Sequence, residues 1–195
     1  MSKVAVFLAN GFEEVEALTP VDYLRRAGAE VFTVAVNDNN SQDNLIINGS
    51  HNIKVVADIT LKDFFNKFSS DLPDCLFCPG GLKGSKNLSE TEELLAFLEK
   101  ANKEGKIISA ICAAPALVLG KTSIPSGKKW TCYPGMAEEG NPDYLNNYTD
   151  KVFVTDGNLV TSRGAGAAEE FAIELIKLLE GNEKAKKIHD STLQR

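Results

Sequence analysis

Cys112 is the residue in this sequence whose surroundings best suit nucleophilic chemistry. A short apolar strand at residues 106–111 leads directly into it, and the small residues Ala113 and Ala114 then open an alanine-rich helix. This pattern is typical of a sharp strand-to-helix turn that holds a side chain out over the end of a sheet. The positive end of a helix lowers the pKa of a thiol placed there, and unpaired N–H groups can bind an oxyanion. From the spacing alone, a buried structural cysteine is an equally good interpretation.

Two further loops could complete such a site. The motif Pro79-Gly80-Gly81 ends another buried strand, so one of its unobstructed N–H groups could join that of Ala113 in an oxyanion hole. Taken alone, the two glycines are better explained by a flexible turn. Glu13, Glu14 and Glu16 lie in the first turn of a predicted helix, where the helix dipole favours carboxylates in any case. Helical periodicity does not decide which of the three faces inward.

The scarcity of histidine narrows the reaction class. The chain has two histidines, His51 and His189, and neither lies in a loop expected to meet Cys112. A Cys–His protease pair is therefore disfavoured. A carboxyl group is the best remaining partner, because desolvation keeps it protonated at neutral pH and it can then donate a hydrogen bond to a thiolate.

Three other motifs have a structural explanation. Cys75 and Cys78 lie in one strand and point to opposite faces, and no second Cys or His pair completes a zinc site, so no metal is expected. The run Gly164-Ala165-Gly166-Ala167-Ala168-Glu169 lacks the third glycine of a dinucleotide fingerprint and predicts a tight turn, with Arg163 facing the cleft or a partner chain. Cys132 is expected to be an ordinary thiol, and no cofactor is expected.

The elements that must position these residues alternate between strand and helix. Strands are predicted at residues 3–9, 30–36, 45–47, 53–56, 75–78, 106–111, 151–155 and 158–161, and helices at 13–27, 61–68, 90–103, 112–119, 167–179 and 182–188. Ser89 is the predicted N-cap of the helix at 90–103. This alternation predicts an α/β sandwich, a mostly parallel sheet with helices on both faces and the candidate site at the carboxyl ends of its strands. With no linker or repeat, residues 1–195 are expected to form a single domain.

Composition excludes several classes of partner. Lys plus Arg number 21 against 27 Asp plus Glu, and the resulting net charge of −6 argues against nucleic acid. No apolar run reaches the roughly 18 residues that span a membrane, and no signal-peptide cleavage site follows the first strand. Four cysteines without a secretory signal indicate free thiols. A cytoplasmic protein that binds neither nucleic acid nor membrane is expected.

Motifs spread over nearly the whole chain resemble the ThiJ/PfpI superfamily, in particular the branch of the Parkinson-disease-associated redox protein and its bacterial relatives. The matching stretches are Gly11-Phe12-Glu13-Glu14-Val15-Glu16-Ala17, Pro20-Val21-Asp22, Arg25-Arg26-Ala27-Gly28, Pro79-Gly80-Gly81, Asn87-Leu88-Ser89, Ala110-Ile111-Cys112-Ala113-Ala114-Pro115 and Thr161-Ser162-Arg163-Gly164. The resemblance implies a flavodoxin-like fold and a homodimer. It also implies that Cys112 is the reactive, easily oxidised thiol, that Glu16 hydrogen-bonds its sulfur, and that Gly81 and Ala113 supply backbone donors.

The sequence departs from the family pattern at three places. Relatives carry a histidine where Tyr133 precedes a proline here, so Tyr133 is a candidate auxiliary residue, together with Arg26 and Arg163. The protease-like branch has a histidine directly after the cysteine, and Ala113 in that place argues against peptidase activity. His51 falls where relatives have an arginine near the dimer contact, so charge recognition there is expected to differ.

The resemblance implies a cofactor-independent enzyme of the glyoxalase III or protein deglycase type, acting on small reactive aldehydes or glycated groups. Cys112 would attack the carbonyl and Glu16 would move a proton between adjacent carbons. The alternative is a non-enzymatic oxidative-stress sensor or redox chaperone, in which Cys112 is oxidised and Glu16 holds the oxidised form. A third interpretation, a binding module in thiamine-related or nucleotide metabolism, has no phosphate site to support it. The first two share one thiol and one carboxyl, so the sequence does not separate them.

Overall fold

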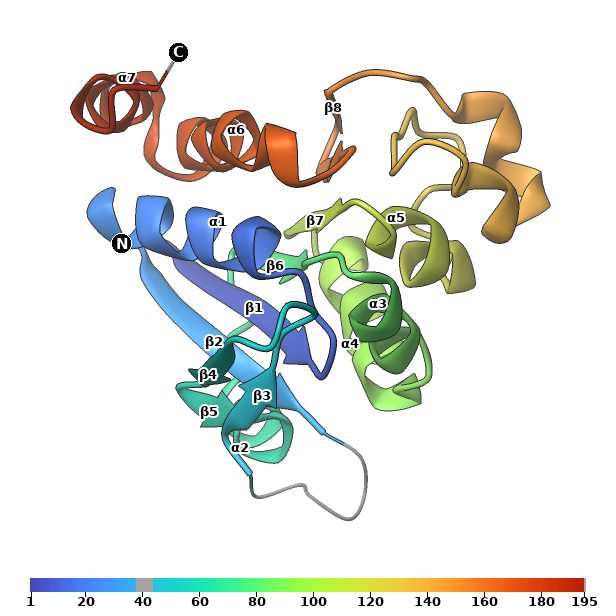
Figure 1. The fold of residues 1–195 in the computed structure, drawn as a ribbon, viewed down its shortest axis with the longest axis horizontal. Coiled ribbons are helices and arrows are strands. Elements are labelled where there is room, and N and C mark those ends of the chain that lie inside the picture. Colours follow the sequence, from blue (N-terminus) through green and yellow to red (C-terminus); the bar gives the residue numbers. More distant parts are fainter. Residues whose placement is uncertain (38–43, 195) are drawn as a thin grey trace.

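A seven-stranded sheet forms the centre of the computed structural model, which describes residues 1–37 and 44–194 (Figure 1). Its strand order is β5-β2-β1-β6-β7-β9-β8, and every neighbouring pair is parallel except β9 and β8. The predicted mostly parallel sheet is confirmed. Its strands are β1 (Lys3–Ala9), β2 (Glu30–Val36), β5 (Ile59–Thr60), β6 (Cys75–Cys78), β7 (Ile107–Ile111), β8 (Phe153–Asp156) and β9 (Leu159–Ser162). A separate antiparallel hairpin is made by β3 (Ile46–Asn48) and β4 (Lys54–Val56).

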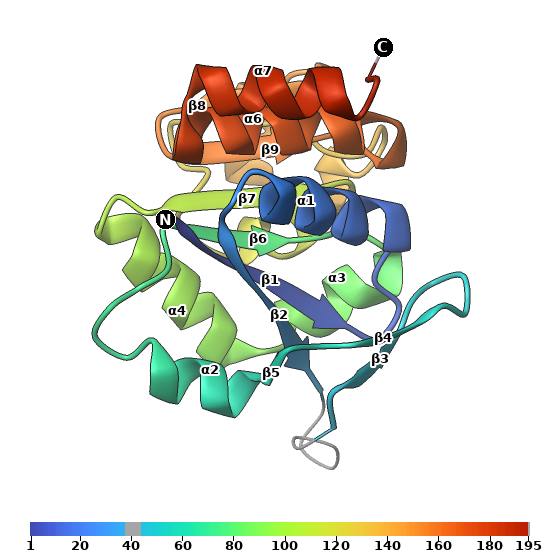
Figure 2. The ribbon, with the colours of Figure 1, turned by 90° about the vertical axis from the view of Figure 1, so that its left-hand side faces the viewer.

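Helices cover both faces of the sheet and give the molecule three layers (Figure 1 and Figure 2). On one face lie α1 (Glu14–Arg26), α6 (Ala168–Glu180) and α7 (Asn182–Ser191). On the other lie α2 (Leu61–Lys67), α3 (Leu82–Ser89), α4 (Glu92–Lys103) and α5 (Ala114–Leu117). Within the described ranges, no helix is both long enough and apolar enough to cross a membrane.

The central strand β1 is buried on both sides, which explains why its sequence is almost wholly apolar. Alternate side chains enter the two cores: Val4, Val6 and Leu8 pack under α1 and α6, whereas Ala5, Phe7 and Ala9 pack on the opposite face. The same alternation separates Cys75 from Cys78, as predicted for two residues three apart in a strand.

The sequence gives no sign of α3, which begins directly after Gly81. Ser89 is its last residue and not the N-cap of the next helix, because α4 begins only at Glu92. Gly84 in the middle of α3 lowers helix propensity and hides the element from pattern analysis. A glycine is needed there because a Cβ would approach the backbone nitrogen of Phe12 to 2.7 Å.

The topology brings the predicted functional loops to one edge of the sheet. Strands β1, β6, β7 and β9 are consecutive parallel neighbours, so their carboxyl ends point the same way. The loop after β1 leads into α1, the loop after β6 carries Gly80 and Gly81, β7 ends at Cys112, and β9 is followed by Gly164. This is the edge at which open α/β sheets hold their ligands.

Candidate active site

Cys112 occupies a strained turn at the end of β7. Its backbone φ of 62° lies in the left-handed region, which is uncommon for a residue with a side chain. The N–H of Cys112 donates to the Ser162 carbonyl at 2.9 Å, and its carbonyl accepts from the N–H of Tyr133 at 2.8 Å. These bonds hold the predicted strand-to-helix turn, which is confirmed. Strain of this kind concentrates at functional sites.

Backbone N–H groups from two loops face the Cys112 sulfur, one from Gly81 and one from Ala113. Gly81 has a φ of 86°, and a Cβ there would collide with the carbonyl of Gly11, so the turn requires glycine. The helix after Cys112 is shorter than the predicted residues 112–119, because α5 spans only Ala114–Leu117. The positive potential at the sulfur therefore comes from these two N–H groups more than from a helix dipole.

Glu13 caps the start of α1, and Glu14 connects α1 to the turn of the hairpin. Glu13 is the N-cap of α1, and its Oε2 accepts the N–H of Glu16 at 2.7 Å. Glu14 accepts the backbone N–H of His51 at 2.7 Å and contacts the His51 imidazole at 2.9 Å. Burial acts to raise the pKa of Glu14, but the hydrogen bonds from His51 outweigh it and lower the pKa to about 2. Glu13, Glu14 and His51 are near enough to share a metal ion, yet both oxygens of Glu14 already accept hydrogen bonds.

Glu16 is the glutamate that the structure places beside the thiol, in agreement with the resemblance. Its side chain is buried, and its carboxyl faces Cys112 and the N–H groups of Gly80 and Ala165. Burial raises the pKa of Glu16 to about 7, and the negative charge of Glu13 adds to the rise. The expected desolvated carboxyl with a raised pKa is thus present next to the sulfur.

The thiol itself does not have the lowered pKa that the sequence predicts. Burial raises the pKa of Cys112 to about 12, and the charge of Glu16 adds to this rise, while the N–H groups of Gly81 and Ala113 oppose it. The prediction of a lowered pKa for Cys112 is therefore wrong when Glu16 is already ionised. Two such close groups titrate together, and between about pH 7 and about pH 12 the pair holds one proton and one negative charge. Whenever that proton rests on the carboxyl oxygen, the sulfur is a thiolate.

The other three cysteines are poor candidates for this chemistry. Cys75, Cys78 and Cys132 are buried, whereas Cys112 is partly exposed, and all four are unpaired thiols. Burial raises the pKa of each of the three, and none of them has a carboxyl as its hydrogen-bond partner. Cys112 alone among the four cysteines combines access with a neighbouring proton acceptor.

The three predicted auxiliary residues lie in different places. Tyr133 is held against the Cys112 carbonyl by its own N–H, and its side chain is 52% exposed. Arg163 follows β9, and its guanidinium lies 3.5 Å from Asp150. Arg26 lies at the far end of α1, about 15 Å from Glu16 at 1.5 Å per residue, and pairs with Asp22 at 2.6 Å. The structure brings Tyr133 to the site and does not bring Arg26.

Sequence analysis missed the contribution of the turn after β9. The N–H of Ala165 faces the Glu16 carboxyl, and Gly164 lies between that carboxyl and the ring of Tyr133. The glycine-rich run at residues 164–169 predicts only a turn, and its match to the family at Gly164 is the one signal that it belongs to the site.

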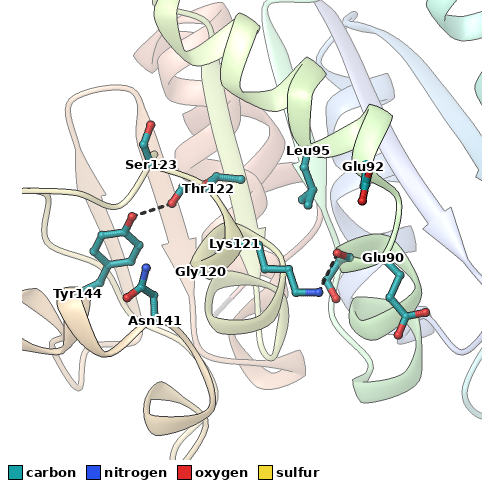
Figure 3. Close-up of a pocket in the computed structure, with 10 residues that line it drawn as sticks. Glu90, Glu92, Leu95, Gly120, Lys121, Thr122, Ser123, Asn141 and Tyr144 are labelled. Carbon is teal, nitrogen blue, oxygen red and sulfur yellow. Dashed lines mark hydrogen bonds between the residues drawn. The ribbon is translucent and has the colours of Figure 1, made fainter.

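A cavity lies elsewhere on the molecule, at the junction of α3 and α4. It has a volume of about 780 Å³, and neither Cys112 nor Glu16 lines it. Figure 3 shows the two hydrogen bonds across its walls, from the Lys121 ammonium to the Ser89 carbonyl at 3.1 Å and from the Tyr144 hydroxyl to the Thr122 carbonyl at 2.7 Å. Within the part of the chain that the structure describes, its lining includes the hydroxyl of Ser123, which donates to Oε2 of Glu99 at 2.8 Å, and no cysteine.

Comparison with known proteins agrees with this fold. Residues 2–178 match the DJ-1/PfpI family. The chain is 39% identical over 192 residues to dj-1beta of Drosophila melanogaster, covering 96% of this chain and 95% of that protein. It is 31% identical over 180 residues to a deglycase of Pyrococcus horikoshii, covering 91% and 99%. Oxidized DJ-1 of Toxoplasma gondii superposes with a TM-score of 0.89 at 35% identity, over 99% of this chain and 98% of that one. The chain belongs to the DJ-1/PfpI family and has its flavodoxin-like α/β fold.

Proposed function

We propose that this protein is a cysteine-dependent enzyme acting on small reactive carbonyls or glycated groups, of the glyoxalase III or deglycase type. The observation that carries the proposal is the Cys112–Glu16 pair, a partly exposed sulfur facing two N–H groups beside a buried carboxyl whose pKa is raised to about 7. Such a pair supplies a nucleophile and a proton carrier at neutral pH. A relative named as a deglycase supports this chemistry at the level of the family.

Methylglyoxal illustrates the proposed reaction. The Cys112 thiolate adds to the aldehyde carbon, and the resulting alkoxide takes a proton to give a hemithioacetal. Glu16, now a carboxylate, removes the hydrogen from that carbon as a proton and returns it to the neighbouring carbonyl carbon. The proton of the hemithioacetal hydroxyl passes to the neighbouring oxygen, which leaves a thioester of lactate. Water then hydrolyses the thioester to lactate and regenerates the thiol. One carbon is oxidised while its neighbour is reduced, so this route needs no external electron acceptor.

The N–H groups of Gly81 and Ala113 have a defined part in this scheme. Because they face the sulfur, they stabilise negative charge there before attack and when the thiol is released. The N–H groups of Gly80 and Ala165 act to lower the pKa of Glu16, so they favour its ionised form beside the sulfur. They therefore help the carboxyl to give up its proton during the reaction.

Turnover of methylglyoxal tests the proposal directly. Wild-type protein is expected to form lactate, whereas Cys112→Ser and Glu16→Gln are expected to lose the activity. Cys75→Ser is the matched control. Cys75 is a buried thiol at the start of β6, whereas the loop that contributes to the site follows the end of β6, and the Cys75 sulfur hydrogen-bonds Ser109. Full lactate formation by Cys112→Ser protein, with its fold verified by circular dichroism, would refute the proposal.

The second candidate function is that of an oxidative-stress sensor, and the accessibility of Cys112 favours it. Peroxide would convert the thiolate to a sulfenate with release of water, and further peroxide would give the sulfinate. Because Cys75, Cys78 and Cys132 are buried, oxidation is expected at Cys112 before the other three thiols. Peptide mass spectrometry after mild peroxide measures this order, and equal oxidation of all four thiols would exclude a sensor built on Cys112.

We also infer a homodimer, as is usual for the family. Apolar side chains exposed on α1 and on the hairpin, Val15, Ile53 and Val56, are available for such a contact. Sedimentation equilibrium at micromolar concentration measures the mass. A monomer throughout that range would contradict the inference.

A further inference from the structure

Two glycines, Gly80 and Gly164, flank the Cys112–Glu16 pair. The space next to the pair is filled at Gly80 and free at Gly164. A Cβ at Gly80 would collide with Oε2 of Glu16 and would lie 2.5 Å from the Cβ of Cys112. A Cβ at Gly164 would instead lie 3.8 Å from Oε1 of Glu16, an ordinary van der Waals distance. There is therefore space for an added carbon atom beside the carboxyl on the Gly164 side and none on the Gly80 side.

Tyr133 forms the wall of this open side. The same Cβ position at Gly164 lies 3.6 Å from Cδ2 of Tyr133, so the tyrosine ring and Oε1 of Glu16 border the same space beside Gly164. The backbone of Tyr133 is fixed by bonds from its N–H to the Cys112 carbonyl at 2.8 Å and from the Met136 N–H to its own carbonyl at 3.0 Å. Its side chain is nevertheless 52% exposed. The ring is thus attached to a backbone held by hydrogen bonds, and Tyr133 is about half exposed to solvent.

We infer that Tyr133 is a specificity-determining residue, whose ring contacts the substituent carried by the reacting carbonyl and favours flat aromatic substituents over a methyl group. This inference rests on the proposed function for its substrate class. An aromatic ring on the substrate would bury apolar area against Tyr133 and pair with it in an offset or edge-to-face arrangement. A methyl group gains little from the same surface.

The preference arises from the ring and not from the phenol hydroxyl. Proton transfer in the proposed reaction is assigned to Glu16, so the hydroxyl of Tyr133 is not needed for chemistry. Tyr133→Phe is therefore expected to keep the preference, and Tyr133→Ala is expected to lose it. The bonds that hold residue 133 come from its backbone, and its side chain is half exposed, so both variants are expected to fold.

The test compares an aromatic and an aliphatic reagent that differ only in the substituent on the carbonyl. Phenacyl bromide and bromoacetone both alkylate a thiol with loss of bromide, and their rates at Cys112 do not depend on turnover. The ratio of the two rates, each divided by that for free cysteine, is expected to fall about two- to tenfold in Tyr133→Ala and to stay unchanged in Tyr133→Phe. Leu178→Ala, which removes an exposed apolar side chain on α6, is the control.

Steady-state turnover of phenylglyoxal and methylglyoxal completes the test. Tyr133→Ala is expected to raise KM for phenylglyoxal by the same factor and to leave kcat for both substrates unchanged. If wild-type protein turns over neither substrate, the proposed function fails while the alkylation ratio still decides the role of Tyr133. An unchanged ratio in Tyr133→Ala, or a loss of kcat for both substrates in Tyr133→Phe, would overturn the inference.

Discussion

Replacing Glu16 by glutamine is expected to stabilise the fold at neutral pH while removing activity. The folded-state pKa of Glu16 is about 7, above its ordinary value of 4.5. Between these two values the unfolded chain has already lost the proton that the folded chain still holds. Stability therefore falls as pH rises through this window, and above about pH 7 the full cost is present. Glutamine does not ionise, so the variant escapes this cost.

The size of the effect follows from the two pKa values. At about 1.4 kcal/mol for each pKa unit, the rise from 4.5 to about 7 corresponds to about 3 kcal/mol. Burial of Glu16, which is 1% exposed, makes solvent screening of this effect small. Oε2 of Glu16 already has no hydrogen-bond partner among the described residues, so the substitution breaks no hydrogen bond at that atom. For a chain of this size, about 3 kcal/mol corresponds to a rise in Tm of roughly 6–12 °C.

Urea unfolding of both proteins from pH 4.5 to pH 8.5, in the presence of a reductant, measures this difference. The variant is expected to gain stability over wild type progressively as pH rises, with most of the gain between pH 4.5 and pH 7. Glu14→Gln is the matched control with the opposite sign, because the pKa of Glu14 is lowered to about 2 and its ionised form stabilises the fold at neutral pH. A difference between Glu16→Gln and wild type that is constant with pH would refute the raised pKa.

Three further predictions follow from the same geometry. The rate of alkylation of Cys112 by iodoacetamide is expected to rise through about pH 7 in the wild-type protein, where the pair loses its first proton. In Glu16→Gln the rate is expected to rise only at higher pH, because the buried thiol must then ionise alone. The same midpoint pH in both proteins would contradict this prediction. Gly80→Ala is expected to lose activity and about 1–3 kcal/mol of stability, because the added methyl group collides with the Glu16 carboxyl. A variant that is fully active in turnover assays and equally stable in urea would disprove this close packing. His51→Asn is expected to raise the pKa of Glu14, which shifts acid unfolding followed by circular dichroism to higher pH; no shift would show that His51 does not hold Glu14 ionised.

The parts of the fold that sequence predicts well are those whose burial is uniform. The bounds of β1, β2 and β6 coincide with apolar runs, because central parallel strands are covered on both faces. The turn at Cys112 could be predicted from the small residues after a strand, which a crowded elbow requires. The helix α3 could not, because Gly84 is kept there by a close contact with Phe12 from another part of the chain.

Hydrophobic periodicity alone could not predict that Glu16 is the glutamate beside the thiol. Hydrophobic periodicity assumes that glutamates face solvent, but both Glu14 and Glu16 are buried. Glu14 accepts hydrogen bonds from the distant His51, whereas Oε2 of Glu16 has no hydrogen-bond partner within residues 1–37 and 44–194. The resemblance supplies the assignment that helical periodicity leaves open. The N–H of Ala165 cannot be predicted in this way, since backbone donors leave no mark in residue type.

Tyr133 also ties the reacting sulfur to the chain's single tryptophan. Trp130 lies three residues earlier in the same segment, and its indole N–H donates to the Tyr144 carbonyl at 2.9 Å while its ring meets Tyr148 edge to face. The N–H of Tyr133 donates to the Cys112 carbonyl at 2.8 Å, so the segment that carries the indole is joined to the turn that carries the thiol. Tryptophan emission is therefore a label-free signal to record while the thiol is modified.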